Sequence, residues 1–196
     1  MSAVTAHPPA PPGDEQLLAR FAAGDRAALD DLFGRHRTVA YRVAYRLLGN
    51  EADALDAVQE GFVKVLTHLA GFQGRSSFRT WLLRVVSNAA LDLGRARGRR
   101  EAGRTDFDET DGPDPGLLVW DDPALGVEQA DLRGLLDAAL QKLPAAQRQT
   151  FVLHVDAGLS YREVAEVLGI SIGTVMSRLF YARQKLRAVL APYVTP

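Results

Sequence analysis

Residues 160–179 read SYREVAEVLGISIGTVMSRL and contain the clearest structural signals in the second half of the chain. Ser160 and Glu163 have the S-x-x-E spacing of a capping box, in which two side chains satisfy the free backbone N–H groups at a helix start. Gly169 accepts the left-handed backbone of a sharp turn, and Ser171 is suited to cap the helix that follows. The stretch therefore predicts two helices joined by a tight turn, which is the layout of a helix-turn-helix.

The second helix of such a motif enters the major groove of DNA. Its spacing places Val175 and Leu179 on the buried side. The opposite side holds small, polar and basic side chains that suit base edges and phosphates. These are Ser171, Gly173, Thr174, Ser177, Arg178, Tyr181, Arg183, Lys185 and Arg187. A helical hairpin that binds only protein is the alternative interpretation.

In the rest of the chain, apolar residues at spacings of three and four predict helices along most of the length. The expected segments are 14–48 with a break at Gly24-Asp25, 50–69, 77–97, 124–143, 144–156, 160–169 and 171–190. Pro144 suits the first turn of its helix, where a missing N–H costs nothing. No segment has the period of two that marks a strand, so the sequence predicts an all-α protein.

An acidic stretch separates two helical regions. Residues 105–131 hold nine acidic residues and no basic one, whereas 75–104 hold eight arginines against two acids and 171–196 hold four basic residues and no acid. This predicts a disordered leader (1–13), a helical domain (14–98), a flexible acidic linker (99–123) and a second small helical domain (124–192). Two basic stretches favour two polyanion contacts, although charge alone leaves ordinary solvated helix faces equally open.

Aromatic and basic residues interleave just before the linker. They are Phe72, Arg75, Phe78, Arg79, Trp81, Arg84 and Asn88. Aromatic rings stack on unpaired bases, arginine holds phosphates, and asparagine reads a base edge, so this composition suits single-stranded DNA. Phe78 and Trp81 stand at helical spacing and are expected in the core, which leaves Phe72 and Asn88 freer to act.

The composition argues against other classes of function. Cysteine is absent, which excludes disulfides and Cys-ligated zinc. The four histidines stand apart, at no metal-ligand spacing, and no glycine loop of the phosphate-cradling type occurs. No apolar run approaches the roughly 18 residues of a membrane span, and the proline-rich start does not resemble a signal peptide. We therefore expect that the protein is not an enzyme, binds no metal ion or cofactor, and does not insert into a membrane.

Three motifs resemble those of bacterial RNA polymerase sigma factors of the sigma-70 family, in the extracytoplasmic-function (ECF) group. Residues 53–62, DALDAVQEGF, resemble the family's D-A-E-D-L-V-Q-E-x-F helix. Residues 72–82, FQGRSSFRTWL, resemble its F-x-G-x-S-x-F-x-T-W-L segment. Leu143-Pro144, Gln147-Arg148 and Gly158–Tyr161 complete the pattern, and the likeness runs from Asp14 to about Leu190.

The resemblance implies a sigma region 2-like first domain and a region 4-like second domain, in a bacterial cytoplasmic protein. It implies that the β′ clamp helices of core RNA polymerase contact Asp53, Asp56, Gln59 and Glu60. It implies that the −10 promoter element is melted and captured by Phe72, Arg75, Ser76, Ser77, Arg79, Arg84 and Asn88. The recognition helix would read the −35 duplex beside the β flap, the linker would run toward the RNA exit path, and an anti-sigma factor would be the regulator.

The chain departs from the family's pattern at several positions. Leu55 stands where Glu is common and Ala57 where Leu is common, and Gly61 is expected to weaken its helix by about 1 kcal/mol relative to Ala. Met176 and Tyr181 replace residues that are often basic, so the −35 sequence cannot be taken from a relative.

Two other functions stay open at this point. One is a stand-alone helix-turn-helix regulator that binds duplex DNA without polymerase and has no use for Asp53 or Asp56. The other is a helical adaptor that binds only protein and has no use for Arg178 or the basic stretch 95–104.

Overall fold

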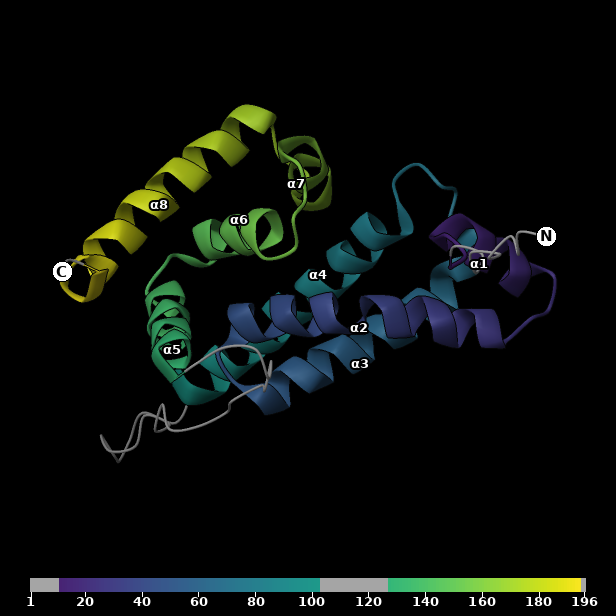
Figure 1. Ribbon diagram of the computed structural model, residues 1–196, viewed down its shortest axis with the longest axis horizontal. Helices are drawn as coiled ribbons and strands as arrows, with labels where there is room; N and C mark the ends of the chain where they lie inside the picture. Colours follow the sequence, from purple (N-terminus) through teal and green to yellow (C-terminus); the bar gives the residue numbers. More distant parts are fainter. Residues whose placement is uncertain (1–10, 103–126, 195–196) are drawn as a thin grey trace, which may run out of the picture. The chain divides into compact units, whose positions relative to one another are not determined.

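The computed structural model describes residues 11–102 and 127–194, and every element within these ranges is a helix (Figure 1). The all-α prediction is therefore confirmed. The elements are α1 (Asp14–Ala22), α2 (Ala27–Leu48), α3 (Glu51–His68), the 3-10 helix η1 (Leu69–Gly71), α4 (Phe78–Ala102), α5 (Val127–Gln141), α6 (Ala145–Val155), α7 (Tyr161–Leu168) and α8 (Ile172–Val194). Most of the predicted leader and linker lies outside the described residues.

Helix boundaries follow the sequence signals closely. Asn50 caps α3, since its side-chain oxygen accepts a hydrogen bond from the backbone N–H of Asp53 at 2.8 Å. Three ends differ from expectation. Pro144 is the extended N-cap residue of α6 instead of a first-turn residue, α4 continues to Ala102, and α8 runs on through Pro192. Proline removes one backbone hydrogen bond near that end.

Within the described residues, none of the helices alone has the length and apolarity to cross a membrane; α7 and α8 pass that test only as a pair, bent by 103°.

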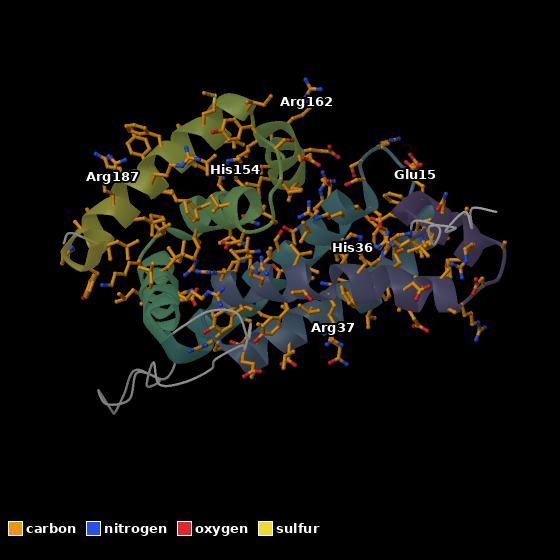
Figure 2. All side chains as sticks on the ribbon, viewed as in Figure 1. Glu15, His36, Arg37, His154, Arg162 and Arg187 are labelled. Atoms are coloured by element: carbon orange, nitrogen blue, oxygen red, sulfur yellow. The ribbon has the colours of Figure 1, made fainter. Side chains whose placement is uncertain are left out.

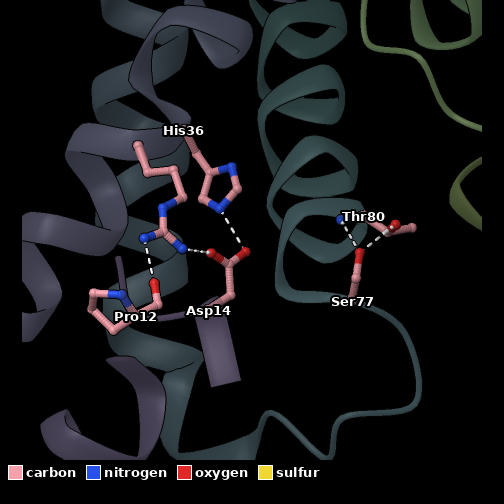
Figure 3. A network of polar contacts seen from close by, with 6 residues as sticks. Pro12, Asp14, His36, Ser77 and Thr80 are labelled. Atoms are coloured by element: carbon pink, nitrogen blue, oxygen red, sulfur yellow. Dashed lines mark hydrogen bonds and ion pairs between the residues drawn. The ribbon is translucent and has the colours of Figure 1, made fainter. Parts of the chain in front are cut away.

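The chain forms two compact units, residues 1–38 and 39–196. In the first, one carboxylate ties α1 to α2. Asp14 accepts from Arg35 Nη1 at 2.7 Å and lies 2.7 Å from His36 Nε2, while Arg35 also donates to the carbonyl oxygen of Pro12 (Figure 3). His36 is buried, so this histidine has a structural partner and belongs to the core of the unit.

In the second unit, α3 and α4 pack closely. Small residues make this approach possible: Ala54, Ala57 and Gly61 are all buried. A Cβ atom at Gly61 would lie 2.7 Å from Cγ2 and 3.2 Å from Cα of Val86 on α4. Gly61 therefore lowers the helix propensity of α3 but allows the two backbones to meet. The departure from the family pattern at this position has a packing reason.

Helices α5 to α8 share a second apolar core, in which α5, α6 and α7 all contact α8. The largest fully buried side chains of this group are Leu140, Val152, Leu153, Leu159 and Leu179. On α7 the buried apolar residues are Val164, Ala165 and Val167, whereas Leu168 at the end of the helix is only half-buried.

A charged cluster forms where α2 meets α5 and the end of α6. Arg46 Nη1 lies 2.6 Å from Asp137, and Arg46 Nε lies 3.6 Å from Asp156. Burial raises the pKa of both carboxyls above the ordinary value of 3.8, although the Arg46 guanidinium acts in the opposite direction. The two aspartates therefore take up protons more readily in the folded chain than in the unfolded one.

We predict that Gly61→Ala lowers the free energy of unfolding by about 1–3 kcal/mol, because the added methyl group overpacks the contact with Val86. Gly34→Ala in α2 is the matched control. No atom lies within 4 Å of its Cβ position, so the same change is expected to stabilise the protein by roughly 0.5–1 kcal/mol. Urea denaturation followed by circular dichroism measures both. Equal effects at the two positions would contradict the close-packing explanation.

We predict that Asp156→Asn changes the pH dependence of stability. Between pH 3.8 and the raised pKa of Asp156, the folded protein binds more protons than the unfolded chain. The contribution of Asp156 to the free energy of unfolding therefore falls as pH rises through that interval. The substitution removes this contribution and makes the slope less negative, as urea titrations at a series of pH values will show. Asp31→Asn, at an exposed position on α2, is the control, and an unchanged slope in Asp156→Asn would contradict burial of this carboxyl as the cause.

Candidate nucleic-acid interface

The capping box at the start of α7 is formed as the sequence predicts. Glu163 Oε2 accepts from the backbone N–H of Ser160 at 2.8 Å and from its hydroxyl at 2.7 Å, while the Ser160 hydroxyl accepts from the Glu163 N–H at 3.3 Å. The bonds from Ser160 hold the pKa of Glu163 below its usual range. Gly169 has φ +65°, and the 103° bend between α7 and α8 falls within the range of a helix-turn-helix.

Helix α8 has the two faces expected of a recognition helix. Ser171 caps it by accepting the Thr174 N–H at 3.0 Å, and its buried side is formed by Val175, Leu179, Ala182 and Leu186. Seven of the nine residues predicted to face DNA are exposed: Ser171, Gly173, Ser177, Tyr181, Arg183, Lys185 and Arg187. The other two, Thr174 and Arg178, are half-buried. Figure 2 shows Arg187 projecting from α8 and Arg162 projecting from α7.

Sequence reasoning missed an apolar stripe on the same helix. Ile172, Met176 and Phe180 are 45%, 54% and 63% exposed, and they stand one helical turn apart. The rings of Phe180 and Tyr181 contact each other with centroids 5.4 Å apart. Their four-residue spacing is the sequence signal for this stripe; of the three, the sequence analysis singles out only Met176, as a departure from the family pattern.

The aromatic residues at the start of α4 form a closed cluster. Phe72 lies 5.0 Å from Trp81 and 6.2 Å from Phe78, measured between ring centroids, and Phe78 is buried. The core placement of Phe78 is confirmed; Trp81 is half-buried, and Phe72, predicted to be freer, packs against both. Ser77 caps α4 by accepting the Thr80 N–H at 3.0 Å (Figure 3).

The other residues predicted for the −10 element fall into two groups. Arg75, Ser77 and Asn88 are exposed and Ser76 is half-buried. Arg79 and Arg84 instead contact the helix-turn-helix: Arg79 donates to the carbonyl oxygen of Ala157, and Arg84 donates to that of Glu166. The structure therefore brings two residues of the single-strand candidate site into contact with α7 and with the segment that precedes it.

The acidic residues of α3 also differ among themselves. Asp53 accepts from Asn50 Nδ2 at 2.8 Å and lies 3.2 Å from Arg97, so it belongs to the helix start. Asp56 and Gln59 are exposed, and Glu60 pairs with Lys64 at 2.5 Å. Three apolar residues share this exposed surface. They are Leu55, Val63 and Leu66, exposed by 52%, 53% and 43%.

Among the described residues, no group of three or more His, Asp or Glu side chains is arranged to hold a metal ion. The site is thus a set of surfaces: a mixed acidic and apolar face on α3, polar residues at α4, and a polar, basic and apolar face on α8.

Comparisons with known proteins assign both halves of the chain. Sigma-70 region 2 matches residues 32–100, and sigma-70 region 4 matches residues 133–186. The ECF RNA polymerase sigma factor SigE of Mycolicibacterium smegmatis is 40% identical over 178 residues, which cover 88% of this chain and 66% of that protein. The RNA polymerase sigma-H factor of Pseudomonas aeruginosa is 32% identical over 183 residues, which cover 91% and 94%.

Solved structures agree. CnrH, in complex with the cytosolic domain of CnrY, has a TM-score of 0.68 at 29% identity, with 92% of this chain and 98% of that chain covered. The sigma factor RpoE of Bartonella quintana, in complex with the anti-sigma factor NepR, has a TM-score of 0.66 at 25% identity, with 83% and 96% covered. Two family matches in order along one helical chain, and relatives of this similarity over most of it, show that the chain belongs to the sigma-70 family of RNA polymerase sigma factors, in the ECF group.

Proposed function

We propose that three helices of this chain divide the work of promoter-specific transcription initiation: α3 binds core RNA polymerase, α4 holds the −10 element and α8 reads the −35 element. Sigma factors are initiation factors and not enzymes. The observation that carries the proposal is α8, a capped helix whose one side is buried and whose other side exposes side chains suited to DNA.

On α8, the exposed side supplies both kinds of contact that a DNA reader needs. Arg183, Lys185 and Arg187 have the charge to hold phosphates, which fix the register on the duplex. Ser177 and Tyr181 offer hydroxyl groups to base edges, and apolar side chains such as Met176 suit the methyl group of thymine. The −35 element of this protein is accordingly expected to differ from those of relatives with basic residues at 176 and 181.

At α4, the exposed Asn88 is the residue best suited to hold an unpaired base, because an amide offers both a donor and an acceptor. Arg75, Ser76 and Ser77 lie in or beside the loop before the helix and reach phosphate or sugar. Phe72 supports this loop by packing on Trp81 and presents only part of its ring as a stacking surface.

On α3, the exposed face combines Asp56, Gln59 and Glu60 with the apolar Leu55, Val63 and Leu66. Apolar side chains next to charged ones at this density are typical of a protein-binding surface. We assign this face to the β′ clamp helices, with Asp53 acting mainly by fixing the start of the helix.

Three further assignments rest on relatives. We assign the β flap as a second polymerase contact of the region 4 domain, and the bacterial cytoplasm, where polymerase acts, as the location. An anti-sigma factor is the expected regulator, since RpoE of Bartonella quintana was solved in complex with one.

The deciding experiment incubates the full chain with bacterial core RNA polymerase and transcribes a promoter library with the complex. Stoichiometric binding and transcription from a narrow promoter set support the proposal and deliver the −35 and −10 sequences. Tight duplex binding by the chain alone, without binding to core polymerase, would indicate a stand-alone regulator instead.

We predict that Asp56→Arg weakens binding to core polymerase by about tenfold or more, because a positive charge replaces an exposed carboxylate in the clamp-binding face. Fluorescence titration of labelled protein with core polymerase measures the affinity, and circular dichroism checks the fold. Asp31→Arg makes the same change of charge at an exposed position on α2 and is expected to bind normally. Normal assembly of Asp56→Arg would remove α3 from the clamp contact.

We predict that Asn88→Ala impairs open-complex formation more than closed-complex formation, by about 1–3 kcal/mol if one base contact is lost. Permanganate footprinting measures promoter opening, and gel shifts at low temperature measure closed complexes. Asp92→Ala, one turn further along α4 and also exposed, is the control. Equal losses in both complexes would show that Asn88 acts on the structure of α4 and not on unpaired DNA.

A further inference from the structure

We propose that an apolar stripe on α8, formed by Ile172, Met176 and Phe180, reads the methyl groups of thymine bases in the −35 element. Met176 is the central determinant of this stripe. It selects a base by covering its C5 methyl group, whereas a basic side chain at the same position would select guanine by hydrogen bonds. The inference rests on the proposed function in taking the −35 duplex as the partner of α8.

The stripe leaves a large apolar surface in water. The side chains of Ile172, Met176 and Phe180 are 45%, 54% and 63% exposed. The core of the domain is supplied from another side of the same helix, by Val175 and Leu179. Exposed apolar surface of this extent marks a site that a partner covers. Because the core accounts for only one apolar side of α8, the stripe needs a partner of its own.

The position of the stripe along α8 favours DNA as that partner. The N-terminal residues of a recognition helix contact base edges, and the stripe begins at Ile172, the first residue of α8. From 172 to 180 it is about 12 Å long at 1.5 Å per residue, which matches the width of the major groove. Gly173 and Ser177 lie beside it and are exposed, and such small side chains let the helix approach the bases closely.

The chemistry of this side of α8 changes where the stripe ends. Steps of three and four residues from Phe180 lead to Arg183 and Arg187, both exposed, and Figure 2 shows Arg187 projecting from the helix. A stripe that docks an amphipathic partner helix would stay apolar along its length. The observed order suits DNA, because apolar side chains cover base methyl groups inside the groove and arginines hold the phosphates at its edge.

The geometry of the stripe also predicts the spacing of the methyl groups. Residues one turn apart are displaced by about 6 Å along a helix, and successive base pairs are displaced by about 3.4 Å along the duplex. With α8 lying in the groove, Ile172 and Met176 therefore reach positions about two base pairs apart. We expect the −35 element to present thymine methyl groups at two base pairs with one base pair between them.

The first test removes the methyl groups and leaves every hydrogen-bonding group in place. Promoters selected by the holoenzyme, which is this chain bound to core polymerase, are synthesised with deoxyuridine for thymidine at one −35 position at a time. Gel shifts at low temperature measure closed-complex formation. Loss of one covered methyl group should weaken binding about fourfold at the positions that are read. Equal binding of the thymine and uracil duplexes at every −35 position would overturn the proposal.

The second test assigns the methyl contact to Met176. In Met176→Ala the uracil penalty at the position it reads should fall from about fourfold to near one, because the side chain that covers the methyl group is gone. Met176→Leu keeps an apolar side chain of similar volume and should retain the penalty. Tyr193→Ala is the matched control, since it removes a side chain that is 62% exposed on the same helix beyond the stripe. A full uracil penalty at every position in Met176→Ala would overturn the assignment.

A third variant should change the selected base. Arginine binds O6 and N7 of guanine through two hydrogen bonds, so Met176→Arg should make the holoenzyme select a G·C pair where the wild type selects an A·T pair. Sequencing of the transcribed members of the promoter library measures this change. The same selected sequence in both proteins would contradict the role of position 176 in base reading.

The outcomes separate this inference from the proposed function. Promoter-specific transcription without any uracil penalty would support the proposed function, overturn methyl reading and indicate a protein partner for the stripe. Failure of the wild-type chain to bind core polymerase would overturn the sigma proposal. The comparison of thymine with uracil would then use the full chain on duplexes selected from random DNA, and selection of no duplex would overturn the inference as well.

Discussion

The carboxylate of Glu163 links the start of α7 to α4. One oxygen completes the capping box with Ser160 and so fixes where α7 begins, and the other accepts the hydroxyl of Thr80 on α4. The start of α7 and its contact with α4 therefore share one side chain. Hydrogen bonds to the ionised form lower the pKa of this group, so the carboxylate stays charged in both roles.

The structure is held by two kinds of contact that differ in strength. Within each helical group, buried apolar side chains and close backbone approach hold the helices, as between Gly61 and Val86. Between α4 and α7, arginines meet carbonyl and carboxylate oxygens in partial contact with water. Apolar cores resist rearrangement, whereas exposed polar contacts exchange readily with other acceptors.

Local sequence signals predicted the local structure well. The S-x-x-E spacing, Gly169 and the apolar periodicity gave the helix-turn-helix and the eight α-helices to within a few residues. What they missed depends on residues far apart in the chain. The close approach of Val86 explains the glycine at position 61, and the Thr80 hydroxyl on α4 donates to Glu163 on α7. Periodicity also does not show that Leu55 and Leu66 are exposed, because α3 has apolar residues on more than one side and the pattern does not reveal which side faces a partner.

The burial of each departure from the family pattern indicates its physical role. A side chain at position 61 would clash with the buried Val86, so Gly61 affects the packing of α3 on α4 and not the protein surface. Leu55 and Met176 are more than half exposed, and neither contributes to a core. An exposed apolar side chain contributes favourable free energy only when a partner covers it and removes it from water. We therefore expect the exposed departures to act in recognition, with Leu55 on the face that we assign to polymerase and Met176 on the face that we assign to the −35 element.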